Sequence, residues 1–154
     1  MLKYYPFKAV IFDLDGVITQ TALVHSAAWK KMFDEFLLSW SKRNGIEFQE
    51  FEHHRDYLSY IDGKPRYQGV ESFLKSRNIE LPFGVPTDPP EMETICGLGN
   101  RKNQVFNEVL EKEGVKVYQT TIDLIYELRK NGIHTAVASS SKNCKAVLER
   151  AGIL

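Results

Sequence analysis

The stretch from Lys8 to Thr19, KAVIFDLDGVIT, decides the fold of this 154-residue chain. Residues 8–14 are β-branched, aromatic or otherwise apolar apart from Lys8 and Asp13, a composition typical of a buried strand in a parallel sheet. The run ends at Asp15-Gly16, which is a turn signal. A strand and a turn followed by a long helical stretch predict the beginning of an α/β fold.

A second segment of the same kind lies near the other end of the chain. Residues 133–138 (IHTAVA) run directly into three serines, Ser139 to Ser141. Two parallel strands so far apart in sequence predict one α/β core, residues 1–18 and 116–154, that is interrupted by a helical insert at 19–115. An all-α bundle with two stray apolar segments is the competing interpretation.

Most of the remaining sequence has apolar residues at helical spacing. The chain also contains one proline-rich stretch, residues 81–90, whose four prolines and one glycine predict an irregular loop. The predicted helices end at glycine or asparagine signals in several places. They span residues 21–41, 47–60, 69–78, 93–113, 120–130 and 142–150.

The composition limits the classes of function. Twenty basic and twenty acidic residues give a formal net charge of zero, so no overall field attracts nucleic acid or an anionic membrane. No stretch approaches the roughly 20 apolar residues of a membrane-spanning helix. We therefore expect a cytoplasmic enzyme with no nucleic-acid or membrane partner. Cys96 and Cys144 lack metal-ligand spacing, which favours two free, reduced thiols.

Two carboxylates, Asp13 and Asp15, follow the first strand. Strand alternation places them on the same side, at the carboxyl end of the strand, where open α/β sheets bind ligands. Carboxylates so close together need a cation, a shared proton or different roles. Mg²⁺, which prefers oxygen ligands, meets this need. The alternative is that Asp15-Gly16 is only a turn and Asp13 only a helix cap.

Ser139 stands between the second strand and the last helix. A hydroxyl and free backbone N–H groups at a helix N-terminus predict an anion site. On its own, Ser139 is better interpreted as an ordinary helix cap.

The run Phe12 to Thr19 resembles the first signature motif of the haloacid dehalogenase (HAD) superfamily, and the strand–Ser–helix unit resembles its second motif. The resemblance implies a Rossmann-like core with an inserted α-helical cap, and Mg²⁺-dependent phosphoryl transfer on a small phosphorylated metabolite, in particular a sugar phosphate. Asp13 is then the nucleophile that forms an aspartyl-phosphate, and Asp15 the general acid/base. Mg²⁺ would be held by Asp13 and the backbone carbonyl of Asp15, and the transferring phosphoryl group by Ser139 and Ser140.

Three further segments resemble the β-phosphoglucomutase branch of the superfamily. Residues 138–143 (ASSSKN) imply that Ser141, Lys142 and Asn143 contact a second, non-reacting phosphate. Residues 17–29 are similar to the hinge and first cap helix, and residues 99–103 to a later cap segment. They imply substrate-binding roles for Thr21 and His25 near the leaving hydroxyl, Trp29 under the substrate, and Lys102, with Arg101 a weaker candidate.

The resemblance also implies that part of the family pattern lies beyond residue 154. The third motif, a lysine, and the fourth, acidic metal ligands, have no match here, which implies an incomplete parallel sheet. A fragment, a truncated gene and a partner chain that supplies the rest are the three explanations. Self-association through exposed sheet edges is a further expectation. Two alternatives to phosphatase activity remain open, a β-phosphoglucomutase-type phosphohexomutase and an inactive chain or part of an assembly.

Overall fold

The computed structural model describes residues 5–153. The chain forms two compact units. The first, here called the strand unit, comprises Met1–Ala22 and Gly114–Leu154, and the second, the helical unit, comprises Leu23–Glu113. The sequence analysis predicted a core of residues 1–18 and 116–154 and a helical insert at 19–115.

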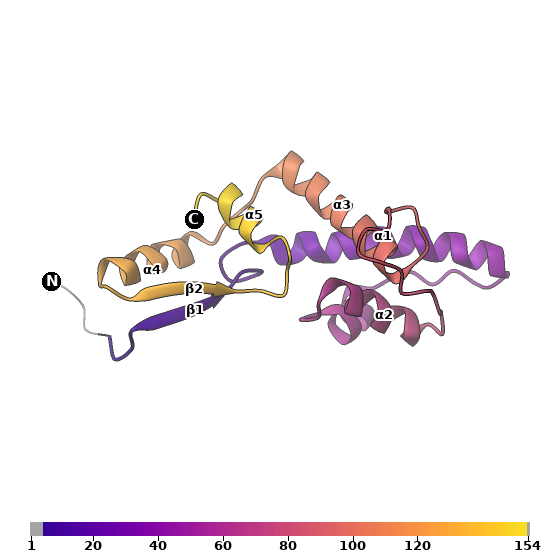
Figure 1. Cartoon of the computed structure of the whole chain (residues 1–154), viewed down its shortest axis with the longest axis horizontal. Coiled ribbons are helices and arrows are strands. Elements are labelled where there is room, and N and C mark those ends of the chain that lie inside the picture. The colour runs from indigo at the N-terminus through magenta and orange to yellow at the C-terminus, as the bar shows by residue number, and fades with distance from the viewer. Residues whose placement is uncertain (1–4, 154) are drawn as a thin grey trace. The chain divides into compact units, whose positions relative to one another are not determined.

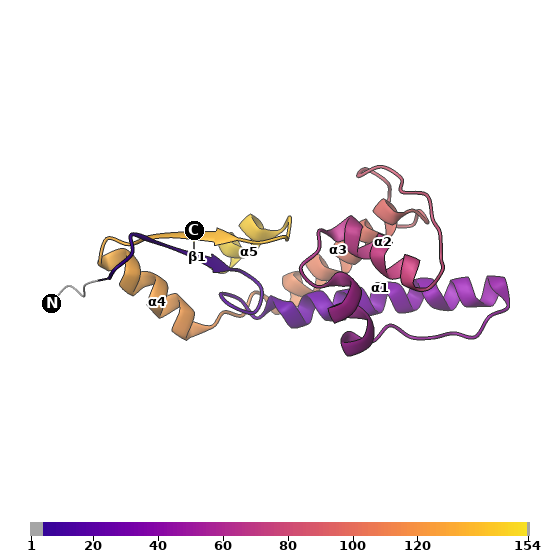
Figure 2. The same ribbon diagram turned by 90° about the horizontal axis from the view of Figure 1, so that it is seen from below.

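The strand unit is built on two parallel strands, β1 (Ala9–Asp13) and β2 (His134–Ala138). Their register pairs Ala9 with His134 and Asp13 with Ala138. Helices α4 (Gln119–Lys130) and α5 (Cys144–Arg150) lie on the same face of this pair (Figures 1 and 2). The predicted parallel strands are confirmed, each a residue or two shorter than expected, and α5 begins two residues later.

The two faces of the strand pair differ in burial. Phe12 is buried on the face covered by α4 and α5, where Ile125 and Leu148 line a cavity of about 410 Å³ with it. Ile11 points to the other face and is 70% exposed. A β-branched residue this exposed in a strand is uncommon, and it agrees with the expected incomplete sheet.

The chain leaves and re-enters the strand unit through two segments that bond to each other. Thr19 forms an antiparallel bridge with Val117, Gln20 N–H donates to the Lys116 carbonyl at 2.8 Å, and Tyr118 N–H donates to the Ile18 carbonyl at 3.0 Å. We call these two segments, residues 18–20 and 116–118, the crossing. They hold the start and the end of the insertion together.

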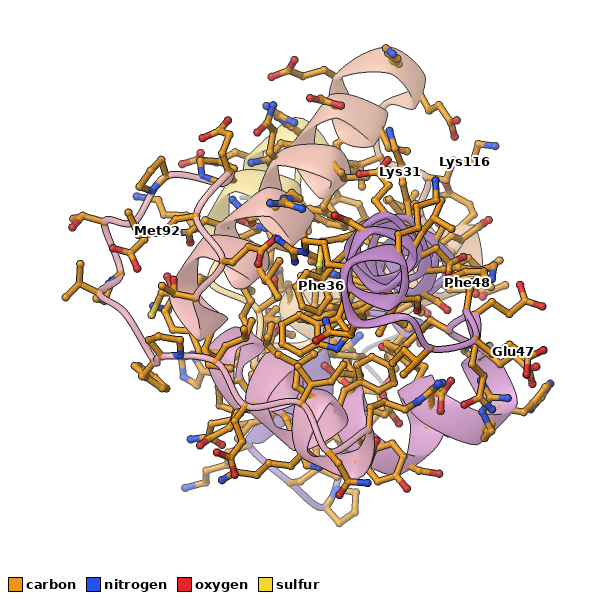
Figure 3. All side chains as sticks on the ribbon, turned by 90° about the vertical axis from the view of Figure 1, so that its right-hand side faces the viewer. Lys31, Phe36, Glu47, Phe48, Met92 and Lys116 are labelled. Carbon is orange, nitrogen blue, oxygen red and sulfur yellow. The ribbon has the colours of Figure 1, made fainter. Side chains whose placement is uncertain are left out.

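The helical unit contains most of α1 (Thr21–Asn44), the π-helix η1 (His53–Ile61), α2 (Arg66–Ser76) and α3 (Ile95–Glu113). Its core is rich in aromatic rings, and Phe36 points from α1 into the interior (Figure 3). Phe33 lies 4.3 Å from Phe73 and 5.1 Å from Phe51, measured between ring centroids. Within residues 5–153, no helix has the length and apolar character needed to cross a bilayer.

The predicted helix at residues 47–60 is wrong in its first half. Residues 46–52 are not helical, because Phe51 N–H is bound by the Asp34 carboxylate of α1 at 2.8 Å. The helix begins only at His53 and is wound as a π-helix, with Asp62 N–H donating to the Tyr57 carbonyl. A side chain 17 residues earlier thus overrides the local helical pattern.

The proline-rich stretch at residues 81–90 is irregular as expected, and the irregular loop continues to residue 94, because α3 begins two residues later than predicted. This loop is firmly bonded to α3. The Asn100 amide donates to the carbonyls of Pro86 and Asp88 at 3.0 and 2.8 Å. Asp88 in turn accepts a bond from Thr94 at 2.7 Å, and Thr94 Oγ1 accepts one from Gly97 N–H in the first turn of α3. Met92, on the outside of the unit (Figure 3), is 45% exposed.

The close approach of this loop to α3 depends on Gly97. A Cβ at Gly97 would lie 2.1 Å from the Met92 carbonyl oxygen, so Gly97→Ala must displace backbone. We expect a loss of about 1–3 kcal/mol in the free energy of unfolding, measured by urea titration. Gly69→Ala in α2 is the matched control, since its Cβ would meet Ile61 at an ordinary 3.5 Å. Better helix propensity should make Gly69→Ala neutral or stabilising. Equal losses for both variants would show that the close contact at Gly97 has no energetic consequence.

Candidate active site

The strand register brings the two predicted motifs to one edge of the sheet. Asp13 is paired with Ala138, and Ser139 is the next residue after β2. The Asp13 side chain is exposed, and its Oδ1 accepts a hydrogen bond from Leu14 N–H at 2.7 Å. Asp13 and Ser139 therefore stand at the carboxyl ends of adjacent parallel strands, where α/β sheets bind ligands.

The second carboxylate, Asp15, is held by a chain of hydroxyl groups. Thr21 donates a hydrogen bond from Oγ1 to Asp15 Oδ1. Thr21 Oγ1 also lies 2.6 Å from Oγ1 of Thr19, and both threonines are fully buried. Gly16, directly after Asp15, makes the turn that leads to the two threonines. Its φ is +80°, a conformation that glycine adopts without strain. The sequence expected Thr21 near a leaving hydroxyl, and the structure places its hydroxyl on Asp15.

The serine run forms a compact turn ahead of α5. Ser141 N–H donates to Ser139 Oγ at 3.1 Å, and Asn143 N–H donates to Ser141 Oγ at 3.2 Å. Ser140 and Lys142 are exposed, while Ser139 is half-buried. The hydroxyls of Ser139 and Ser141 therefore organise the backbone of the turn, and this orders the N–H groups that an anion would meet.

The sequence did not show that a cysteine lies close to the carboxylates of Asp13 and Asp15. Cys144, at the first position of α5, is half-buried and free. Burial raises the pKa of its thiol, and the charges of Asp15 and Asp13 raise it further. The thiol is therefore neutral at pH 7 and does not compete with the carboxylates as a nucleophile or metal ligand. Cys96, which is buried, is not part of a disulfide either.

In the helical unit, two of the predicted substrate residues, His25 and Trp29, lie around the ammonium group of a third, Lys102. Lys102 of α3 is only 4% exposed, and its Nζ lies 2.6 Å from His25 Nδ1 of α1. The same Nζ lies 5.1 Å from the centroid of the Trp29 ring and 4.8 Å from that of Phe106. Phe106, which the sequence did not single out, stacks on the His25 imidazole at 4.0 Å.

Two arginines of the helical unit differ in what they can do. Arg101, the weaker candidate, donates from Nε to the Pro90 carbonyl at 2.7 Å and so fixes the proline-rich loop. Arg66, at the start of α2, is half-buried and donates to Asn103 Oδ1 at 2.8 Å. Burial lowers the pKa of the Arg66 guanidinium, although an arginine remains charged at neutral pH.

The donors at the strand edge fit a magnesium ion in kind. Mg²⁺ in phosphoryl-transfer sites binds through one or two carboxylates and keeps several waters or substrate oxygens. The exposed carboxylate of Asp13 and the backbone carbonyl of Asp15 are such hard oxygen donors. Across residues 5–153, no group of three or more His, Cys, Asp or Glu side chains gathers as a metal cage. These donors therefore suit a Mg²⁺ ion whose remaining ligands are waters and oxygens of a bound phosphate.

The comparison with known proteins agrees with this geometry. The sequence matches the family of haloacid dehalogenase-like hydrolases over residues 7–154. The chain therefore belongs to that family, and the Rossmann-like α/β fold expected from the sequence is confirmed.

Within the family, the chain is similar to β-phosphoglucomutases. It is 44% identical to Beta-phosphoglucomutase of Mycobacterium bovis over 146 residues, which cover 95% of this chain and 56% of the relative. It is 31% identical to the protein of the same name in Bacillus subtilis, covering 96% and 57%. The crystal structure of β-phosphoglucomutase from Clostridium difficile superposes with a TM-score of 0.69 at 25% identity, covering 95% and 57%. The chain thus spans little more than half the length of these relatives.

Proposed function

We propose that this chain is the nucleophile-bearing part of a Mg²⁺-dependent phosphoryl-transfer enzyme that acts on a small phosphorylated metabolite, a sugar phosphate. The observation that carries the proposal is the strand register. Pairing of Asp13 with Ala138 brings an exposed carboxylate and the Ser139 turn to the same edge of the sheet. A nucleophile beside an anion-binding turn is the arrangement that phosphoryl transfer through a covalent intermediate requires.

In this mechanism the carboxylate oxygen of Asp13 attacks phosphorus and forms an aspartyl-phosphate. Asp15 protonates the leaving oxygen and then takes a proton from the incoming water or hydroxyl. Thr21 supports this role, because its hydrogen bond fixes the orientation of the Asp15 carboxylate. Ser139 and the backbone N–H groups of the following turn, including that of Ser140, bind the oxygens of the transferring group.

Asp13 and the Asp15 carbonyl would hold Mg²⁺. The ion, when bound, offsets the charge repulsion between the carboxylate nucleophile and the phosphate. The chain's own residues then orient the phosphate and move the proton.

The substrate needs further contacts outside the phosphate site. His25, Trp29 and Lys102 supply a hydrogen-bonding imidazole, an aromatic surface and a buried cation within one cluster of the helical unit. Arg66 adds a guanidinium that can bind a phosphate with two parallel hydrogen bonds. In the strand unit, Ser141, Lys142 and Asn143 are the proposed contacts for a second, non-reacting phosphate.

A phosphohexomutase is the second candidate. The observation that favours it is the 44% identity to a protein named Beta-phosphoglucomutase. The two candidates differ in the acceptor, because a phosphatase transfers the group from Asp13 to water and a mutase transfers it to a sugar hydroxyl.

A third candidate of another class is an inactive chain or one part of an assembly. The matched 146 residues cover 56% of the Mycobacterium bovis relative. If the rest of that relative contributes active-site groups, a chain without them would be slow, since loss of even one electrostatic contributor costs roughly 10²–10³ in rate. We expect negligible turnover from residues 1–154 on their own.

The experiment that tests the proposal is a chimeric protein, here called the graft. In it, this chain replaces the segment of the Mycobacterium bovis relative to which it is similar, 56% of that protein. We expect the purified graft to turn over β-glucose 1-phosphate with Mg²⁺ and a hexose bisphosphate primer. Isomerisation would support the mutase, and phosphate release without isomerisation would eliminate it. A folded graft that does neither with any of a panel of sugar phosphates would refute the proposed function.

A further inference from the structure

Lys102 is a buried lysine whose ammonium group contacts the imidazole of His25. Lysine is almost never fully buried without a partner, yet Lys102 is 4% exposed. Two aromatic rings, Trp29 and Phe106, lie within about 5 Å of its Nζ, and the imidazole of His25 meets it at Nδ1. The 2.6 Å contact between Nζ and Nδ1 requires one proton between the two nitrogens.

Intrinsic basicity favours the lysine as the holder of the proton between these nitrogens. An amine is more basic than an imidazole by about four pKa units, and burial disfavours the charged form of both groups. The aromatic rings also favour a charged lysine, because ring faces attract a cation. An ammonium has only donors, so Nδ1 of His25 accepts the bond. A neutral imidazole that accepts at Nδ1 carries its one proton on Nε2.

The ring is also held in orientation. Phe106 is fully buried and stacks on the imidazole with an interplanar angle of 15°. It follows Lys102 by four residues on α3, as Trp29 follows His25 by four residues on α1, so each pair presents neighbouring side chains from one helix face. Phe106 therefore fixes the plane of the imidazole. The hydrogen bond with Lys102 favours one tautomer of the ring.

We infer that the helical unit holds His25 as the neutral tautomer protonated at Nε2, with Lys102 and Phe106 as its positioning residues. This arrangement makes His25 a hydrogen-bond donor, through the nitrogen on the far side of the ring from Lys102. The assignment of this tautomer does not rest on the proposed function.

The tautomer can be measured directly on the 154-residue chain. Long-range ¹H–¹⁵N correlation spectra of ¹⁵N-labelled protein at pH 8 distinguish a protonated from an unprotonated ring nitrogen, and the His25→Gln spectrum assigns the signals. We expect Nδ1 unprotonated and Nε2 protonated. Lys102→Met, which keeps the chain length and the ring contacts but removes the donor, should move the His25 signals toward an averaged mixture of tautomers. Lys102→Arg should keep the preference, because it restores a cationic donor.

His53 is the internal control, since its Nδ1 bonds to the Ser26 hydroxyl in the same unit and not to a lysine. Its signals should be the same in all variants. Phe106→Leu tests the stacking separately and should remove the ring-current shift of the His25 protons, while Phe106→Tyr should keep it. A wild-type His25 protonated at Nδ1, or a tautomer unchanged in Lys102→Met, would overturn the inference even if a variant had altered stability. An inactive graft would leave it standing, so the two failures are distinguishable.

Discussion

Replacing Asp13 with asparagine in the graft is expected to lower kcat/KM by roughly 10⁴ or more, because loss of a nucleophile removes the covalent route altogether. The asparagine amide has nearly the same shape as the carboxylate but cannot attack phosphorus. The Leu14 N–H bond to Oδ1 can still form, so the loop should keep its conformation. Steady-state assays of sugar phosphate turnover measure the effect, and circular dichroism checks the fold.

Two comparison variants sharpen this result. Asp123→Asn changes an aspartate of α4 whose carboxylate accepts a hydrogen bond from Gln119 one helical turn away, and it should leave kcat/KM unchanged. Thr21→Val removes one hydrogen bond to the Asp15 carboxylate, which corresponds to a loss of about 10- to 100-fold. Full activity in Asp13→Asn would remove Asp13 from the mechanism and, with it, the proposed function.

Replacing Asp56 with alanine is expected to destabilise the helical unit by about 3–5 kcal/mol. Asp56 lies in η1 with its side chain 3% exposed, and its Oδ2 contacts Arg55 at 2.7 Å and Arg77 at 2.9 Å. It also accepts the Glu52 N–H at 2.9 Å. Removal of the carboxylate leaves the largely buried guanidinium of Arg77 without its charge partner. Urea unfolding followed by far-ultraviolet circular dichroism measures the loss.

Because of the Asp56 carboxylate, we expect the stability of the helical unit to depend on pH in the acid range. Burial by itself would raise the pKa of Asp56, but the hydrogen bonds from Arg55 and the Glu52 N–H and the charge of Arg77 outweigh it and hold the pKa below its ordinary 3.8. The folded pKa is the lower one, so the stabilisation is present above pH 3.8 and is lost as the pH falls through the folded value. This acid sensitivity should be absent from Asp56→Ala.

A surface ion pair serves as the control. Glu71 and Lys75 form an i,i+4 pair on α2 at 2.9 Å, with side chains 40% and 70% exposed. Glu71→Gln should cost well under about 1 kcal/mol. Comparable losses for Glu71→Gln and Asp56→Ala would show that the burial of Asp56 has no energetic consequence.

The features that the sequence predicted best are those with a local cause. An apolar run that ends in Asp15-Gly16 predicted β1, and the run before Ser139 predicted β2. The parallel pairing followed from their place at the two ends of an α/β pattern, and this pairing puts Asp13 beside Ala138. For the strand edge, therefore, local composition and topology sufficed.

The features that could not be predicted depend on distant contacts. The late start of η1 follows from Asp34, and a 3.6-residue pattern does not distinguish a π-helix from an α-helix over nine residues. Burial of Lys102 runs against the usual exposure of lysine, and only the fold shows the rings around it. Phe106 looks like any core phenylalanine until α1 brings His25 against it.

The crossing has an evolutionary consequence. Because residues 18–20 and 116–118 are bonded to each other, the chain departs from the strand unit and returns to it at one place. Whatever polypeptide joins those points needs only to begin and end close together. Inserts of quite different length and shape can therefore be exchanged there during descent while the two strands, with Asp13 and Ser139 at their ends, keep their arrangement.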